Sequence, residues 1–214
     1  SMLNTEELNM LKRAIAYIVL VAIIIGCWGT TGCSREKTIP KQQLAILNQL
    51  LSTSVSDKQV EIIEIQDETA QKFPAIDKMF KVVADEEQEN YVFLVSPVGY
   101  RAPINIMVAI DGEKDEIAGI KVLQQDETPG WGEWLAETWF TDRFKGKSVD
   151  IYLERAVLEA KAPNEIIQIT SATVTTQAVL NGVNAAMGAY KELVLGSEAE
   201  AVPLNVEGFI TESE

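Results

Sequence analysis

A long run without a single charged residue, at residues 14–33, limits what this chain can fold into more than any other feature. The first part of the run reads AIAYIVLVAIII. In a helix, about 20 such residues are long enough to cross the roughly 30 Å hydrocarbon core of a bilayer. We therefore expect a polar cytoplasmic head at residues 1–13, a single transmembrane helix at residues 14–33, and a folded domain after it.

Two other interpretations of the apolar run remain open. It could be a cleaved signal peptide. It could also be the leader of a lipoprotein, because Ile24-Ile25-Gly26-Cys27 is similar to a lipoprotein cleavage box with Cys27 as the acylated residue. Basic residues stand on both sides of the run, so the distribution of positive charge does not set its orientation. The short head and the large C-terminal part favour a domain on the extracytoplasmic side.

The residue types that the chain lacks exclude several classes of function. The net charge of −14 argues against a nucleic-acid partner, because such proteins need basic patches that replace counterions. The absence of histidine removes the commonest metal ligand and the commonest general acid or base, so we expect neither a metal site nor a catalytic triad. Both cysteines, Cys27 and Cys33, belong to the apolar run, which leaves none for a disulfide or an iron–sulfur cluster in the domain.

After residue 34 the sequence alternates short β-type runs with polar turns, which is typical of an antiparallel meander. The pattern predicts an α+β fold with a mixed or antiparallel sheet and packed helices over residues 34–195, followed by an acidic tail at residues 196–214, extended or partly disordered. We expect helices at residues 41–51, 133–144 and 177–193. We expect strands at residues 78–84, 91–98, 104–111, 117–124, 150–153, 157–160 and 166–170, with residues 55–64 as a strand or a loop.

The stretch Glu127-Thr128-Pro129-Gly130-Trp131-Gly132 predicts a tight turn, because Pro followed by Gly favours one and the two glycines allow a close approach of the backbone. Three of the four tryptophans, Trp131, Trp134 and Trp139, follow one another closely here. Tryptophans on a helix are usually core anchors. An aromatic cluster beside a glycine turn would also suit a flat aromatic ligand, and both interpretations stay open.

A cluster of hydroxyl groups, Thr170-Ser171-Ala172-Thr173-Val174-Thr175-Thr176, separates a β-type run from the last predicted helix. This order places Thr173 at or just before the N-terminus of that helix. Ser and Thr are favoured there because their oxygens cap free N–H groups, which is the ordinary explanation of such a cluster. The same N–H groups and the positive end of the helix dipole also attract phosphate.

Together, the turn, the hydroxyl cluster and the apolar run resemble the FMN-binding G subunit of the Rnf electron-transport complexes. The C subunit of the Na⁺-translocating NADH:quinone oxidoreductase is a close relative of that family. In the family, FMN is joined through its phosphate to the last residue of the pattern Asp, two residues, Ser or Thr, Gly, Ala, Thr. Thr170, Ala172 and Thr173 match this pattern, whereas Ile167 replaces the Asp and Ser171 replaces the Gly.

The resemblance implies a covalent FMN phosphoester on Thr173, with the flavin beside the glycine turn. Trp131 or Trp134 could stack on the ring, and Thr175 and Thr176 could donate hydrogen bonds to the phosphate or cap the helix. The implied cofactor-binding residues are Thr170, Ser171, Ala172, Thr173, Val174, Thr175, Thr176, Glu127, Thr128, Pro129, Gly130, Trp131 and Gly132.

The resemblance also implies an electron-transfer protein within an ion-translocating ferredoxin:NAD⁺ oxidoreductase, without an independent active site. Such a protein would cross the inner membrane once, with its FMN domain outside the cytoplasm. Its partners would be the lipid bilayer, the integral and peripheral subunits of the complex, and a flavin transferase. Two alternatives remain: the C subunit of the Na⁺-translocating NADH:quinone oxidoreductase, and a membrane-anchored binding lipoprotein that carries no flavin.

Overall fold

The computed structural model describes residues 39–84 and 88–209. The expected head at residues 1–13 and the expected anchor at residues 14–33, with Cys27, lie outside the described residues. Within the part of the chain that is described, no helix is both long enough and apolar enough to cross a bilayer.

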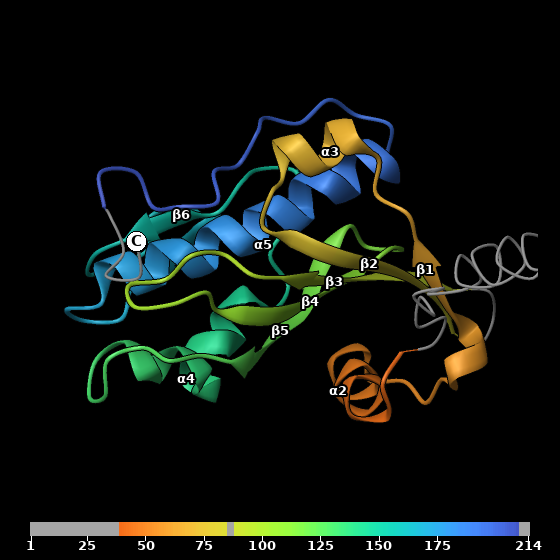
Figure 1. Ribbon diagram of the computed structural model, residues 1–214, viewed down its shortest axis with the longest axis horizontal. Helices are drawn as coiled ribbons and strands as arrows, with labels where there is room; N and C mark the ends of the chain where they lie inside the picture. The colour runs from red at the N-terminus through yellow and green to blue at the C-terminus, as the bar shows by residue number, and fades with distance from the viewer. Residues whose placement is uncertain (1–38, 85–87, 210–214) are drawn as a thin grey trace, which may run out of the picture. The chain divides into compact units, whose positions relative to one another are not determined.

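An antiparallel sheet of five strands forms the centre of the domain, in the order β1-β2-β3-β4-β5 (Figure 1). Strands that follow one another in sequence are neighbours in the sheet, so the predicted meander is confirmed. The strands are β1 (Val60–Ile63), β2 (Ile76–Val83), β3 (Glu89–Val95), β4 (Asn105–Asp111) and β5 (Glu116–Gln124).

Both faces of the sheet are covered, because helices α5 (Thr173–Leu193) and α2 (Lys41–Leu51) lie on opposite sides of it (Figure 1). Side chains alternate between the two faces of a strand. On β3, Phe93 therefore packs in the same apolar cluster as α5, whereas Val92 packs with Leu47 of α2. This arrangement explains why β3 reads as an almost uninterrupted apolar run.

Helix α5 begins at Thr173 and is buried from Ala178 to Tyr190. The small helix α3 (Asp67–Lys72) also contributes to this side of the domain, since Lys72 forms an ion pair with Glu192 of α5 at 2.5 Å. The helix predicted at residues 177–193 is thus confirmed, and it starts one turn earlier.

A short parallel pair follows, formed by β6 (Glu154–Ala156) and β7 (Glu165–Ile167), and β7 overlaps the start of the strand predicted at residues 166–170. The strand expected at residues 150–153 is wrong, because the side chain of Asn184 binds both the N–H and the C=O of Leu153, at 2.8 and 2.9 Å. The strand expected at residues 157–160 is also wrong, since the side chain of Leu158 is 87% exposed and finds no core.

The helix predicted at residues 133–144 is broken into three short pieces: η3 (Gly132–Ala136), α4 (Thr138–Thr141) and η4 (Asp142–Phe144). Glu137 interrupts the helix, because its backbone is extended, with φ −73° and ψ 144°. The break buries Leu135, Phe140 and Phe144 and leaves the neighbouring tryptophans outside the core.

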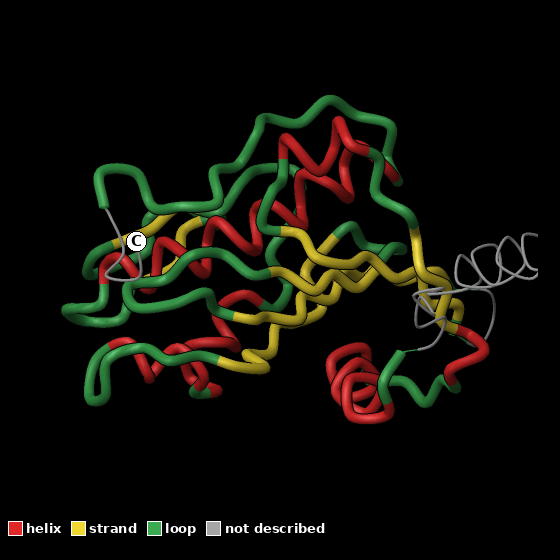
Figure 2. The backbone as a smooth tube through the Cα atoms, viewed as in Figure 1, coloured by secondary structure: helices red, strands yellow, loops and turns green. Residues whose placement is uncertain are grey.

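Residues 196–209 run back along α5 as an irregular loop (Figure 2). They are extended but not disordered, since Ala199 and Val202 are buried. The N–H of Val202 donates to the carbonyl of Lys72 at 3.0 Å, and Asn181 of α5 donates to the carbonyl of Asn205 at 3.2 Å. The expectation of a partly disordered tail therefore does not hold for these residues.

Candidate functional site

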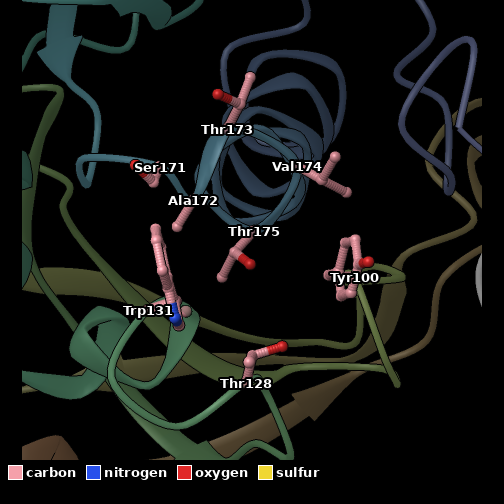
Figure 3. A pocket seen from close by; sticks show the side chains of 9 residues that line it. Tyr100, Thr128, Trp131, Ser171, Ala172, Thr173, Val174 and Thr175 are labelled. Carbon is pink, nitrogen blue, oxygen red and sulfur yellow. The ribbon is translucent and has the colours of Figure 1, made fainter.

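A cleft of about 320 Å³ brings together the two motifs that the sequence singles out (Figure 3). This volume lies at the lower end of the range for small-molecule sites. Three separate segments line it: the turn after β5, the first turn of α5 with the residues before it, and the loop after β3. The lining residues are Thr128, Trp131 and Gly132, then Ser171, Ala172, Thr173, Val174 and Thr175, and finally Tyr100.

Two aromatic side chains stand on opposite sides of this cleft, with the start of α5 between them (Figure 3). Trp131 comes from the glycine turn, and Tyr100 comes from the loop between β3 and β4. The ring of Tyr100 stacks on Phe209, with centroids 5.1 Å apart, so residues 196–209 support this wall. The two walls could enclose a flat aromatic ring, which prefers offset stacking or edge contacts.

A second, more open cleft adjoins the first and shares Trp131 and Ser171 with it. Trp131, Trp134 and Trp139 are 51%, 42% and 46% exposed, so their interpretation as core anchors is wrong. The guanidinium of Arg143 lies 5.0 Å from the ring centroid of Trp139, and partial burial lowers the pKa of Arg143 from its ordinary value. The other residues that line this cleft are Gly130, Ile169 and Thr170.

The start of α5 is not an ordinary capped terminus. Ala172 occupies the N-cap position, and no described side chain accepts a hydrogen bond there. Ser171, just before it, has a left-handed backbone with φ 61°. The interpretation of the hydroxyl cluster as a plain N-cap is therefore wrong. The N–H groups of the first helical turn remain available to an anion.

The three threonines of the first turn have different environments. Thr173 is exposed, and its hydroxyl donates a long hydrogen bond of 3.4 Å to Oε1 of Gln168. Thr175 is 2% exposed and donates to Glu127, whereas Thr176 is fully buried and accepts from the N–H of Ile169 at 3.1 Å. Thr175 is thus not free to donate to a phosphate, and neither Thr175 nor Thr176 caps the helix.

Glu127 lies behind the wall of the cleft rather than in it, because its side chain is 3% exposed and is not among the lining residues. Its Oε1 accepts from the N–H of Arg101 at 3.1 Å, and its Oε2 accepts from the hydroxyl of Thr175. Of the other residues expected at the site, Pro129 and Thr176 also do not line either cleft.

Glycine is needed at positions 130 and 132 of the turn for different structural reasons. Gly130 has φ +75°, which favours glycine, and nothing lies within 4 Å of where its Cβ would be. A Cβ on Gly132 would stand 2.8 Å from Oγ1 of Thr175 and 2.9 Å from Cβ of Glu127. The close approach at Gly132 is therefore made to the protein itself.

Three residues at the site were not predicted from the sequence: Tyr100, Gln168 and Ile169. Tyr100 lies between the strands predicted at residues 91–98 and 104–111, and an aromatic residue in such a connection can indicate a binding role. Gln168 lies inside the motif pattern, and its Oε1 also accepts from Nη1 of Arg155 at 2.6 Å. Nothing local in the sequence joins it to Arg155, since that contact depends on the pairing of β6 with β7.

Formal charge is missing from the first cleft, since all nine of its described lining residues are neutral. Among residues 39–84 and 88–209, no group of three His, Cys, Asp or Glu side chains could hold a metal ion. The site therefore offers aromatic walls, hydroxyl groups and free backbone N–H groups, which suit a neutral or singly charged organic ligand.

Comparison with known proteins finds similarities that include this site. Residues 99–188 match the family model of the FMN-binding domain, and this range contains every residue that lines the two clefts. Over 212 residues the chain is 26% identical to the G subunit of the ion-translocating oxidoreductase complex of Aliivibrio fischeri, covering 96% of this chain and 99% of that protein.

Two further likenesses agree with this match. The G subunit of the Na⁺-translocating ferredoxin:NAD⁺ oxidoreductase complex of Acetobacterium woodii is 31% identical over 110 residues, which cover 50% of this chain and 52% of that protein. The crystal structure of the Na⁺-translocating NADH-quinone reductase C subunit from Parabacteroides distasonis superposes with a TM-score of 0.53 and 19% identity, covering 72% of this chain and 92% of that one. At this identity the second likeness concerns the fold alone.

Proposed function

Because residues 99–188 match the FMN-binding domain family and nearly the whole chain is similar to the G subunit of an ion-translocating oxidoreductase, we propose that this protein is the electron-transfer G subunit of such a complex. Bound FMN supplies the electron transfer, and the protein supplies its position and surroundings. The absence of histidine agrees with this role, since no side chain has to act as an acid or base on a substrate.

The finer part of the proposal is that FMN is joined through its phosphate to Oγ1 of Thr173. One observation carries it: Thr173 is the exposed threonine of the first turn of α5, and it shares a cleft with the glycine turn. The ester joins the threonine oxygen to the phosphorus, and the adduct has the mass of FMN less one water. Ile167 and Ser171, the two departures from the family pattern, leave the hydroxyl of Thr173 exposed.

A covalent link suits a site with this chemistry. The first turn of α5 has backbone N–H groups that no described side chain caps, and the helix dipole favours an anion there by about 0.3–1 kcal/mol. No lysine or arginine is among the described residues that line the cleft, so ion pairing does little to retain the phosphate. The ester removes this need, and Trp131 with Tyr100 would hold the ring.

The proposed setting is a multi-subunit ion-translocating oxidoreductase in the inner membrane, with residues 14–33 as a single-pass anchor and the FMN domain outside the cytoplasm. Other proteins of the complex and a flavin transferase are its partners. The C subunit of the NADH-quinone reductase is the second candidate, on the structural likeness. The G subunit is favoured because the sequence similarity to a protein of that name extends over nearly the full length.

The test is the intact mass of the chain after co-expression with a flavin transferase. The protein without substitutions should gain the mass of FMN less one water and keep its yellow colour after denaturation. Thr173→Ala should abolish both, whereas Thr138→Ala, which removes an exposed hydroxyl outside the family pattern and outside both clefts, should keep them. Full modification of Thr173→Ala would move the acceptor elsewhere, and colour that is lost on denaturation would contradict the ester.

A further inference from the structure

One buried acidic side chain lies behind the first cleft without lining it. Glu127 is 3% exposed, and its two oxygens point to different partners: Oε1 to the N–H of Arg101 at 3.1 Å, and Oε2 to the hydroxyl of Thr175. In both bonds the partner is the donor, so the carboxyl oxygens of Glu127 accept both hydrogens. The proton of the Thr175 hydroxyl is therefore committed to Glu127.

This commitment decides what the cleft presents at Thr175. A hydroxyl has one proton and two lone pairs, so an oxygen that donates its proton backwards can only accept on its other side. Thr175 is one of the residues that line the cleft. We infer that Glu127 is a positioning residue: it orients the Thr175 hydroxyl so that this wall accepts a hydrogen bond and selects a ligand group that donates one.

The inference rests on the proposed function for the identity of the ligand. FMN has hydrogen-bond donors in its ribityl hydroxyls and its ring N–H, whereas its ionised phosphate oxygens only accept. A wall of lone pairs with a carboxylate behind it disfavours the phosphate and favours the sugar or the ring. The phosphate is then directed to Thr173, which is exposed and stands beside uncapped N–H groups. Glu127 thereby helps to determine which threonine is modified.

The substitution Glu127→Gln, which replaces one carboxyl oxygen by an NH₂ group, should change the Thr175 hydroxyl from an acceptor to a donor toward the cleft. In Glu127→Gln, the buried N–H of Arg101 still needs an acceptor, so the amide oxygen takes the place of Oε1. The amide NH₂ group then faces Thr175 and donates to its oxygen. The hydroxyl of Thr175 can then no longer donate to residue 127. Because Thr175 lines the cleft, its hydroxyl proton would point into the cleft. The wall would change from an acceptor to a donor with almost no change of volume.

The experiment measures riboflavin binding to the full chain by quenching of flavin fluorescence, with Thr173→Ala as the reference background. Riboflavin has no phosphate, so ester formation does not enter. Glu127→Gln and Thr175→Val should each weaken binding about threefold to tenfold, the loss of one net hydrogen bond. The double variant should bind riboflavin no more weakly than the single variant with the lower affinity. Thr175→Ser, which keeps the hydroxyl, should bind like the reference.

Glu165→Gln is the matched control, because Glu165 also accepts two hydrogen bonds, from the N–H groups of Lys161 and Ala162, but lies outside both clefts. It should leave binding unchanged. Unchanged binding in folded Glu127→Gln would overturn the inference, as would a further loss when Glu127→Gln is added to Thr175→Val. If Glu127→Gln does not fold, Thr175→Val against Thr175→Ser decides, and equal binding by the two refutes it. A reference that binds no riboflavin would refute the proposed flavin site itself.

Discussion

The hydroxyl oxygen of Thr176 accepts a hydrogen bond of 3.1 Å from the main-chain N–H of Ile169. Both residues are buried, and this bond ties the first turn of α5 to the end of the segment that follows β7. The residues between them, including Thr173, are therefore held in a fixed bend at the mouth of the cleft.

Thr176→Val should destabilise the domain. Valine has the shape of threonine but leaves the buried N–H of Ile169 without its acceptor, which costs about 1–3 kcal/mol of unfolding free energy. Urea denaturation of the two proteins measures the difference. Thr173→Val, at an exposed position three residues earlier, should change the stability by less than about 0.5 kcal/mol. Equal effects of the two substitutions would show that the bond to Ile169 contributes nothing.

Gly132→Ala should disturb the site more than Gly130→Ala. The new Cβ at position 132 would be 2.8 Å from Oγ1 of Thr175 and 2.9 Å from Cβ of Glu127, so the turn and the helix must move apart, at about 1–3 kcal/mol. At position 130 the surrounding space is open, and only the left-handed backbone costs about 1–2 kcal/mol. Riboflavin binding separates the two, because it should weaken in Gly132→Ala and stay close to the reference in Gly130→Ala. The opposite order would mean that the approach of the turn to Thr175 does not shape the cleft.

Trp131→Ala should weaken riboflavin binding in the Thr173→Ala background about twofold to tenfold, since an aromatic contact is worth about 0.5–1.5 kcal/mol beyond its buried area. The same titration detects the bound ring through quenching of tryptophan fluorescence, which should fall when Trp131 is absent. Trp139→Ala is the control, because Trp139 lines only the second cleft. If Trp139→Ala has the larger effect, the ring occupies the second cleft instead.

Tyr91 should make the domain sensitive to alkaline pH. Burial raises the pKa of Tyr91 from 10.0 to about 12, and its hydrogen bond of 2.9 Å to Glu89 adds to the shift. The folded state then keeps a proton that the unfolded state has lost, so this contribution to stability is complete below pH 10.0 and disappears as the pH rises to about 12. Urea midpoints across this window should fall less steeply for Tyr91→Phe than for the unmodified chain. Parallel slopes would contradict the shift.

The sequence predicts those parts of the fold that depend on local periodicity. The alternation of apolar runs and polar turns is enough for the meander from β2 to β5, because each strand pairs with the next one in sequence. The small residues of α5 and the hydroxyl cluster before it place Thr173 at the start of the helix, as the structure has it. The structure brings eight of the motif residues together around the first cleft: Thr128, Trp131, Gly132, Ser171, Ala172, Thr173, Val174 and Thr175.

The remainder depends on contacts between distant residues, for which no local pattern exists. Glu127 and Thr175 are 48 positions apart, and only the folded chain reveals that the carboxylate serves the threonine. Tyr100 becomes a wall of the cleft through its loop and through Phe209. The segment at residues 133–144 has an apolar spacing close to that of a helix, but the extended backbone of Glu137 reverses the assignment of which aromatic residues are buried.

The neutral lining of the first cleft has a consequence for the conditions under which a cofactor stays in place. Dissolved ions largely screen exposed charges that are more than about 8 Å apart at physiological ionic strength, and they have much less influence on ring stacking or on bonds between hydroxyl groups. The contact of a flavin ring with Trp131 and Tyr100 should therefore change little with moderate changes in salinity.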